Sequence, residues 1–172
     1  GTLRRMSSGT SSFGRGGAAS RSRVEFVPAA EVEADGRLSR RVKRTQLKRA
    51  DRAIEKLIRS YQQELGLLTD VSRESLVFAT VQDLVATLQI IAADEDVQVV
   101  RVKNRLDPSY DAKASAGYRD VALNLQIVTP YTAELGIDTH VCELQLILVR
   151  FAELKSEEGH KRYVEFRNAR GE

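Results

Sequence analysis

Apolar residues recur at steps of three and four between residues 38 and 65, and this spacing predicts one long helix. The apolar positions are Leu38, Val42, Leu47, Ala50, Ile54, Leu57, Ile58, Tyr61 and Leu65. Ser39 is a suitable N-cap for this helix, and Gly66 is a suitable residue to end it. The opposite face is strongly basic, and it is interpreted either as a solvated surface or as an anion-binding surface.

The rest of the chain alternates between strand-like and helix-like patterns. Strands are predicted over residues 72–78, 97–105, 119–128 and 141–149, and helices over 80–93 and 150–168. Thr80 and Asp83 have the spacing of a capping box at the start of the second helix. The order α-β-α-β-β-β-α indicates an α/β or α+β fold, with a mixed sheet of about four to five strands flanked by helices.

Alternation along each predicted strand assigns its side chains to two faces. Strand 97–105 carries three cations on one side: Arg101, Lys103 and Arg105. Strand 119–128 has one apolar face and one largely polar face, formed by Val121, Leu123, Leu125 and Ile127 and by Asp120, Ala122, Asn124 and Gln126. Strand 141–149 is apolar on the inward face and carries Glu143 and Gln145 on the other.

Charge and composition divide the chain into residues 1–37, a basic Ser/Gly/Arg-rich extended tail, and residues 38–172, one folded domain. The first 24 residues contain five arginines and no acid, which gives them a charge of +5 and leaves −2 for the rest. Their low apolar content predicts disorder in isolation. We therefore expect the tail to make few contacts with its own domain and to bind other protein subunits, with nucleic acid as a partner only at the tail. An organellar presequence is the alternative interpretation.

Composition also argues against several other classes of protein. No apolar run approaches the ~20 residues that cross a bilayer, so no membrane span is expected. The slightly acidic body gives no support for non-specific nucleic-acid binding by the folded domain. A single cysteine excludes an internal disulfide, and one cysteine with two histidines gives no zinc-site spacing. These features favour an intracellular protein, either cytoplasmic or inside an organelle.

Two acidic residues are candidates for metal binding. Asp70 precedes the first predicted strand, and Glu143 interrupts the otherwise apolar last strand. Such carboxylates hold Mg²⁺ against a triphosphate in nucleotidyl and pyrophosphoryl transfer. The alternative interpretations are an ordinary turn residue for Asp70 and a cross-strand ion pair for Glu143.

The string Gly117-Tyr118-Arg119-Asp120 places an aromatic ring and a cation at the start of a strand. Tyr118 is suited either to stacking on a nucleobase or to packing on the rim of the sheet. Arg119 joins the three cations of strand 97–105 in a phosphate cradle or, alternatively, in a salt-bridge ladder. His160, on the last predicted helix, is either a site residue or an ordinary surface histidine.

Four strings resemble the motifs of one enzyme family in the same order. Asp70-Val71-Ser72-Arg73-Glu74-Ser75-Leu76 follows Asp-Leu-x-Gly-x-Arg-Ile at its Asp and apolar positions. Gly117-Tyr118-Arg119-Asp120-Val121-Ala122 follows Gly-Tyr-Arg-Ser-Leu-His, and Glu143-Leu144-Gln145-Leu146-Ile147-Leu148 follows Glu-Ile-Gln-Ile-Arg-Thr. Phe151-Ala152 and His160-Lys161 resemble a closing aromatic-Ala…His-Lys motif. The family is the RelA/SpoT alarmone synthetases, and the resemblance covers residues 48–163 in a diverged, eukaryotic-type form.

This resemblance implies a nucleotidyltransferase-like fold in which Asp70 and Glu143 are catalytic and hold Mg²⁺. It also implies that Glu143 lies near the acceptor 3′-hydroxyl and that Tyr118 stacks on guanine. The two carboxylates are then expected at adjacent strand ends, about 4–7 Å apart, since Mg–O bonds are near 2.1 Å. The candidate nucleotide-binding residues are Lys48, Lys56, Arg101, Lys103, Arg105, Tyr118, Arg119, Gln145, His160 and Lys161.

The chain departs from the family motifs at positions that affect charge. Ser75, Ala122 and Ile147 stand where the family has Arg, His and Arg. Arg73 replaces a Gly that permits close backbone approach, and Asp120 replaces a Ser and adds negative charge beside the expected triphosphate site. Losing cationic phosphate contacts weakens transition-state stabilisation.

Three functions are compatible with this pattern. The first is a diverged, catalytically weak or inactive domain that serves as a structural or accessory subunit of a larger assembly. The second is an active Mg-dependent pyrophosphotransferase that uses ATP and GTP and makes guanosine alarmone-type products. The third is a nucleotide-sensing module without turnover. Magnesium is expected only for the active form, and otherwise no cofactor is expected.

Overall fold

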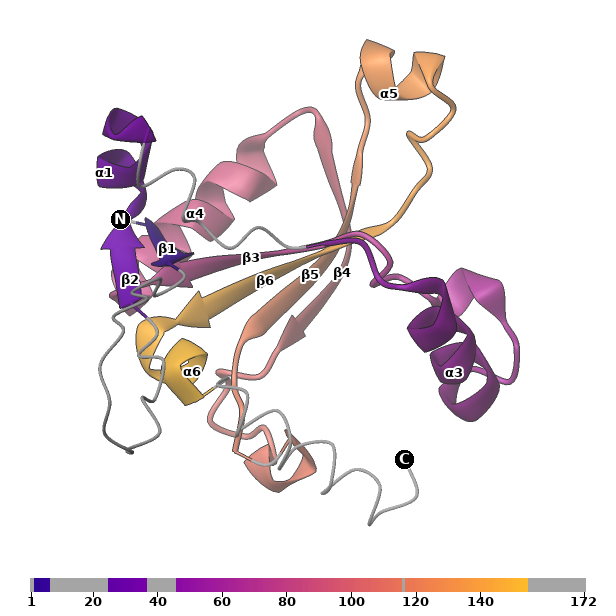
Figure 1. Ribbon diagram of the computed structural model, residues 1–172, viewed down its shortest axis with the longest axis horizontal. Helices are drawn as coiled ribbons and strands as arrows, with labels where there is room; N and C mark the ends of the chain where they lie inside the picture. Colours follow the sequence, from indigo (N-terminus) through magenta and orange to yellow (C-terminus); the bar gives the residue numbers. More distant parts are fainter. Residues whose placement is uncertain (1, 7–24, 37–45, 116, 155–172) are drawn as a thin grey trace, which may run out of the picture.

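The computed structural model describes residues 2–6, 25–36, 46–115 and 117–154 (Figure 1). They form a sheet with the strand order β2-β1-β3-β6-β5-β4. The strands are β1 (Thr2–Met6), β2 (Glu25–Pro28), β3 (Arg73–Phe78), β4 (Val97–Asn104), β5 (Val121–Ile127) and β6 (Cys142–Leu148). β3 and β6 run parallel, whereas the other neighbouring strands are antiparallel. The mixed sheet with flanking helices confirms the predicted fold class, and β1 and β2 extend it to six strands.

Short caps and turns fix the helices around this sheet. The helices are α1 (Ala29–Ala34), α3 (Ala50–Ser60), α4 (Val81–Ala93), α5 (Pro130–Glu134) and α6 (Val149–Leu154), with 3-10 helices η1 (Leu65–Leu67) and η2 (Ala112–Ser115). Thr80 caps α4 by accepting a hydrogen bond from the Asp83 amide at 3.1 Å, as its spacing predicts. Thr129 and Thr132 form a reciprocal capping box on α5. Across these ranges, no helix is both long enough and apolar enough to span a membrane.

The helix predicted over residues 38–65 is shorter in the described part of the chain. α3 begins at Ala50 and ends at Ser60. It ends there because Gln62 and Gln63 have φ angles of 49° and 69°, in the left-handed region that a right-handed helix cannot contain. Leu65, the last apolar residue of the predicted helix, lies instead in the separate 3-10 helix η1. Helical spacing therefore overstated the length of the element.

Two further expectations about helices fall partly outside the described residues. The predicted cap Ser39 lies among residues 37–45, which are not described. α6 is the described beginning of the last predicted helix, and residues 155–168 of that prediction are likewise not described. The short helix α5 and the turn η2 were not predicted, because each has too few residues for a periodic pattern.

The expectation that the tail makes few contacts with its own domain is wrong for β1. This strand pairs antiparallel with β2 and also extends the sheet beside β3, where Thr2 lies opposite Phe78 and Leu3 opposite Val77. Composition misled the prediction because a strand paired on both sides, as β1 is with β2 and β3, is held by backbone hydrogen bonds, which require no apolar side chain. The tail therefore contributes directly to the sheet.

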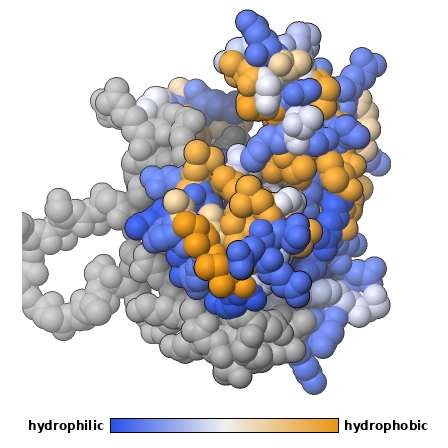
Figure 2. Space-filling view, turned by 90° about the vertical axis from the view of Figure 1, so that its right-hand side faces the viewer, coloured by the Kyte–Doolittle hydropathy of each residue, from blue (hydrophilic) through white to orange (hydrophobic). Residues whose placement is uncertain are grey.

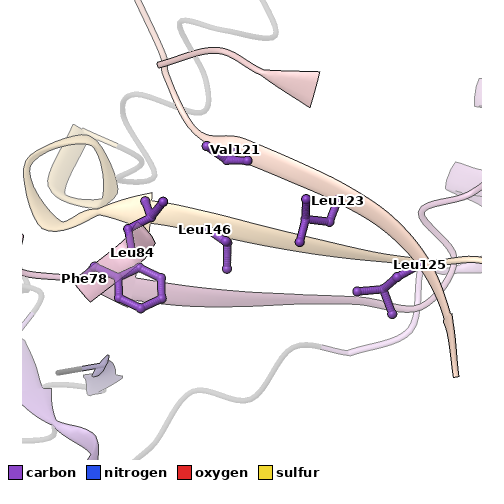
Figure 3. Packing of buried hydrophobic residues seen from close by; sticks show 6 residues of the cluster. All are labelled: Phe78, Leu84, Val121, Leu123, Leu125 and Leu146. Atoms are coloured by element: carbon purple, nitrogen blue, oxygen red, sulfur yellow. The ribbon is translucent and has the colours of Figure 1, made fainter. Parts of the chain in front are cut away.

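One face of the sheet forms the hydrophobic core together with α4 (Figure 3). The buried cluster consists of Phe78, Leu84, Val121, Leu123, Leu125 and Leu146. The register places Val121 opposite Leu146 and Leu123 opposite Leu144, so the apolar faces of β5 and β6 coincide as predicted. Burying each such side chain contributes about 1.5–3 kcal/mol, and the core thereby fixes the backbone from which the polar face projects.

The opposite face of β3 and β6 changes character along its length. Where the strands begin, it carries two polar register pairs, Arg73–Glu143 and Ser75–Gln145. Where they end, it carries Val77 and Ile147, which are only 6% and 2% exposed, and α6 contacts both strands. The polar groups of this face are therefore concentrated at the end of the sheet where β3 and β6 start.

α3 lies at this end of the sheet, away from α6 (Figure 1). None of its residues is buried, and Ile54 and Ile58 are 56% and 64% exposed. Figure 2 shows apolar surface among hydrophilic side chains on the side of the molecule that includes α3. Apolar packing therefore contributes little to the position of α3, and polar contacts hold the helix in place.

Replacing Leu146 with alanine should destabilise the protein by about 2–5 kcal/mol, because the fully buried side chain leaves a cavity in the core. Leu135→Ala is the matched control, since Leu135 is 52% exposed, and it should cost no more than about 0.5 kcal/mol. Urea denaturation of both variants measures the difference. Equal losses of stability would contradict the position of Leu146 in the core.

Candidate functional site

Asp70 binds two lysines that lie far from it in sequence. Lys48 Nζ donates a hydrogen bond to Asp70 Oδ2, and Lys56 Nζ donates to the same oxygen over 3.0 Å. The side chains of Lys48, Lys56 and Asp70 are 18%, 28% and 9% exposed. These three candidate residues therefore form one largely buried group, called the Asp70 cluster below.

The local path of the backbone brings this cluster together. The Lys48 amide donates to the carbonyl of Val71 at 2.9 Å, which places Lys48 beside Asp70. Lys56 lies on α3, and its ammonium group stands 5.0 Å from the centre of the Tyr61 ring. The chain then reverses, with the Gln63 amide bound to the carbonyl of Leu57 at 3.0 Å, and returns through η1 to Asp70. The cluster thus attaches α3 to the start of β3.

Burial and pairing shift the pKa values of the cluster. Burial acts to raise the pKa of Asp70, but the hydrogen bonds and charges of Lys48 and Lys56 outweigh it and lower that pKa. Burial lowers the pKa of Lys48, and the charges of Lys56 and Arg73 act in the same direction while Asp70 opposes them. For Lys56, burial is opposed by Tyr61 and Asp70, which raise its pKa. Asp70 is therefore a stabilised carboxylate between cations.

Glu143 begins the polar face of β6 beside the start of β3. It pairs in register with Arg73, and its amide donates to the carbonyl of Ser72 at 2.9 Å. Its carboxylate accepts a hydrogen bond from Gln145 Nε2 at 2.8 Å, and Gln145 Oε1 accepts one from Ser75 Oγ at 3.3 Å. Asp70 and Glu143 thus lie at the starts of adjacent parallel strands. The expected separation of their carboxylates, about 4–7 Å, and their role as metal ligands stay predictions.

A bulge in β4 places two cations on the same face as Glu143. Simple alternation would put Arg101 and Lys103 on the core face with Val97 and Val99. The register shifts between Val99 and Arg101, and beyond this bulge Arg101 pairs with Asn124 and Lys103 with Ala122. Asn124 and Ala122 in turn pair with Glu143 and Gln145 of β6. Among the described side chains, neither Arg101 nor Lys103 forms an ion pair.

A second group, called the Asp120 cluster, joins Asp120 to Arg105 and Tyr118. Asp120 is fully buried, Arg105 Nη1 donates to its Oδ1, and the Tyr118 hydroxyl donates to its Oδ2 at 3.0 Å. Burial and then the charge of Asp120 raise the pKa of Tyr118 far above its ordinary value. Arg105 therefore neutralises the negative charge that Asp120 adds, and Arg105 itself is engaged by this contact.

Arg119 holds the loop that follows β4. Its guanidinium group donates to the carbonyls of Arg105, Asp107 and Tyr110 at 2.9, 2.8 and 3.1 Å. It also lies 5.7 Å from the centre of the Tyr110 ring. The structure therefore gives Arg119 a loop-positioning contact that the sequence motif did not indicate, and its contact with a phosphate stays a prediction.

A cleft of about 400 Å³ is lined by Thr69, the chain neighbour of Asp70, but by none of Lys48, Lys56 and Asp70. It lies between residues of the 65–69 segment, including Thr69, and residues of the 136–141 loop, including His140 and Val141. Asn124 Nδ2 donates to Thr69 Oγ1 at 3.1 Å and ties this segment to the polar face of β5. The volume of the cleft is within the range of small-molecule sites, and no sequence pattern had indicated the cleft.

The Asp70 carboxylate has one oxygen to offer a metal ion. Asp70 Oδ1 is buried and has no hydrogen-bond partner among the described residues. A buried carboxylate oxygen without a partner is costly, and a cation would satisfy it. Within the described ranges, no group of three or more His, Cys, Asp or Glu residues is arranged to hold a metal. That Asp70 and Glu143 hold Mg²⁺ stays a prediction, and two carboxylates would leave most of its coordination sites to other ligands.

The altered motif positions lie in different surroundings. Ser75 and Ala122 flank Gln145 in register, on the polar face. Ile147 lies on the same face farther along β6, but it is buried where α6 contacts the strand. The last two candidates, His160 and Lys161, lie in the part of the chain that the structure does not describe.

Comparison with solved structures identifies the fold. Small alarmone synthetase 2 from Bacillus subtilis matches 72% of this chain with 20% identity and a TM-score of 0.54, and 62% of the synthetase is covered. Small alarmone synthetase 1 from the same organism, bound to its product pppGpp, matches 73% of this chain with 17% identity and a TM-score of 0.55, over 67% of its own length. A GTP pyrophosphokinase family protein from Streptococcus pneumoniae matches 78% of this chain with 15% identity and a TM-score of 0.57, over 68% of its length.

The chain thus spans just under two thirds of the synthetase 2 structure. No protein-family model matches the sequence, and no curated protein matches it significantly. The chain therefore shares the fold of alarmone synthetases, as the sequence resemblance predicts.

Asp120→Asn should destabilise the protein by about 1.5–3 kcal/mol, because Arg105 would lose its counter-ion in a buried site. Glu55→Gln is the control, since Glu55 forms exposed ion pairs with Arg52 and Arg59, and it should cost about 0.5 kcal/mol or less. Urea unfolding at neutral pH compares the two. If both variants lose the same small amount, the Asp120 cluster contributes no net stability.

Proposed function

Starting from the RelA/SpoT-like synthetase fold, we propose that this domain binds a magnesium–nucleoside triphosphate complex at the Asp70 cluster and transfers pyrophosphate weakly or not at all. The observation that carries the proposal is the Asp70 carboxylate, which has one oxygen bound to two lysines and the other without a partner among the described residues. This group lies at the start of β3, which pairs with the strand that carries Glu143. Anionic phosphates and a divalent cation are the ligands that such a mixture of charges suits.

The roles of the individual residues follow from their positions. Asp70 and Glu143 would hold Mg²⁺, which supplies neutralising charge for the triphosphate. Lys48 and Lys56 would bind phosphate oxygens, while Glu143 would orient the acceptor hydroxyl. Tyr118 would stack on a base with its hydroxyl fixed by Asp120. Arg101 and Lys103 add positive charge on the same face.

Weak transfer is proposed because several cations are missing or already engaged. Ser75 and Ala122 offer no charge, and Ile147 is buried. Arg105 is bound to Asp120, and Arg119 to three carbonyl groups. Positive charge aimed at the developing negative charge of a transition state is usually the largest catalytic contribution, so its loss lowers the rate more than it lowers binding.

The second candidate function is an active pyrophosphotransferase that makes guanosine alarmone-type products. The acidic pair Asp70 and Glu143 favours it, together with the two lysines. The similar synthetase 1 was solved with pppGpp as its product, which supports a guanosine nucleotide as acceptor. Nucleotide sensing corresponds to binding without transfer. A structural or accessory role stays a prediction from the sequence, and the pairing of β1 within the sheet weakens its argument from the tail.

Incubation with ATP, GDP or GTP and Mg²⁺ should give little or no pyrophosphate transfer, while calorimetry should detect binding of ATP with Mg²⁺. Chromatography of radiolabelled nucleotides measures the transfer. Rapid turnover that disappears in Glu143→Gln would replace the first candidate with the second. Absence of both binding and turnover would refute both nucleotide functions.

Ser75→Arg should raise pyrophosphate transfer by at least about tenfold, because one charge-assisted hydrogen bond to a phosphate is worth about 1.5–3 kcal/mol. Ser75 is part of the polar face and is only partly buried, so the longer side chain has access to solvent there. Gln82→Arg on the exposed surface of α4 is the control for added charge and should leave transfer unchanged. The same radiolabel assay decides. An unchanged rate in Ser75→Arg would show that the missing cation at this position does not limit the reaction.

A further inference from the structure

Building on the proposed function, we propose that Lys48 and Lys56 form a latch on Asp70 that selects the metal–triphosphate complex over the bare cation and over the metal-free triphosphate. Because of the latch, the divalent cation and the triphosphate each strengthen the binding of the other. Its basis is the unequal use of the two Asp70 oxygens. Oδ2 accepts hydrogen bonds from both lysines, whereas Oδ1 has no partner among the described residues.

The net charge of the cluster opposes a bare cation. One carboxylate and two ammonium groups sum to +1, and the charge of Arg73 also acts on Lys48. All three side chains are less than a third exposed, so solvent screens these charges incompletely. A divalent cation at the open Oδ1 would lie beside the two ammonium groups held on Oδ2, and their charge repels it. Relieving this repulsion requires the lysines to leave Asp70, and they would then remain largely buried without a counter-ion.

A metal-free triphosphate meets the reverse difficulty. Lys48 and Lys56 can turn to its phosphates only by leaving Asp70. Asp70 would then be a carboxylate at 8% exposure without a cation, next to additional negative charge. The cost of leaving that charge unpaired reduces the gain from the new phosphate contacts.

The complex of both components removes both costs together. The lysines exchange a carboxylate for phosphates, and Asp70 exchanges the lysines for the divalent cation. Each charged group gains a partner as it loses one, so the first component lowers the cost of binding the second. This is a positive coupling free energy between two ligands, and it is reciprocal.

Asp70 is thereby assigned a second property that a simple metal ligand lacks. In the protein without nucleotide, its carboxylate competes with the phosphates for the two lysines. Removing its charge should consequently strengthen the binding of metal-free ATP, while it removes most of the benefit of Mg²⁺. A residue that served only as a metal ligand would leave metal-free ATP binding unchanged when substituted.

Calorimetric titration of the full chain with ATP, in EDTA and in MgCl₂, tests the latch. In the unaltered protein, Mg²⁺ should strengthen ATP binding by at least about tenfold. In Asp70→Asn, metal-free ATP should bind about tenfold more tightly than in the unaltered protein, and the effect of Mg²⁺ should nearly vanish. Glu95→Gln removes one negative charge from the exposed turn before β4, and it should reproduce the behaviour of the unaltered protein.

A second variant tests the reciprocal half of the coupling and keeps the proposal testable if Asp70→Asn fails to fold. Lys56→Met removes one of the two lysines of the latch. It should strengthen the binding of Mn²⁺ alone, which electron paramagnetic resonance measures directly, and it should weaken the binding of metal-free ATP. A lysine that served only structure would change neither affinity in a folded variant.

The outcomes separate the latch from the proposed function. If ATP binds with Mg²⁺ but Asp70→Asn leaves metal-free ATP binding unchanged or weaker, the latch is refuted and nucleotide binding stands. If Lys56→Met does not strengthen Mn²⁺ binding, the latch is refuted in the same way. If the unaltered protein binds ATP in neither buffer, the proposed function fails, and the latch fails with it.

Discussion

The contact between Asp70 and its two lysines is the interaction on which the arrangement of this end of the molecule depends. α3 has no buried residue, and its exposed isoleucines show that apolar packing against the described chain is slight. Lys56 and Lys48 join the helix and the segment before it to the residue that precedes β3. The same carboxylate is therefore both the anchor of α3 and the candidate ligand group, so a ligand that engages Asp70 acts directly on the position of the helix.

The two buried aspartates of the fold differ in how completely their carboxylate oxygens are paired. Both oxygens of Asp120 have partners, because Arg105 occupies one and Tyr118 the other, and the residue is fully buried. Asp70 has both of its cations on one oxygen and none of the described groups on the other. A satisfied buried carboxylate stabilises one conformation, whereas a half-satisfied one retains a capacity for a further partner. Two aspartates at similar depth thus differ in whether their carboxylate can take a further partner.

The sequence pattern predicted the central strands, the core face of β5 and β6 and the capped helix α4, because each has a long and clean period. It failed where a few residues decide the geometry. Gln62 and Gln63 end α3 through backbone angles that no periodicity reveals, and the bulge near Val100 moves Arg101 and Lys103 to the opposite face of β4. Within the candidate site, sequence reasoning named Lys48, Lys56 and Asp70 but could not place them on one oxygen, since residues 14 and 22 positions apart meet only through the chain reversal. The sequence left a phosphate cradle and a salt-bridge ladder open for Arg105 and Arg119, and it indicated neither the ion pair of Arg105 with the nearby Asp120 nor the carbonyl contacts of Arg119.

Binding and catalysis place different demands on such a site, and the departures from the family motifs affect the second more than the first. Holding a metal–triphosphate complex requires charges that neutralise the ground state, and Lys48, Lys56 and Asp70 with Glu143 are suited to that. Accelerating transfer requires additional cations at the positions where charge develops in the transition state. Where the family motifs have arginine, this chain has Ser75, which is neutral, and Ile147, which is buried on the same face where α6 contacts β6. An arginine at residue 147 would have to displace packing as well as add charge, whereas residue 75 requires only the charge, so the two losses differ in how readily they could be reversed.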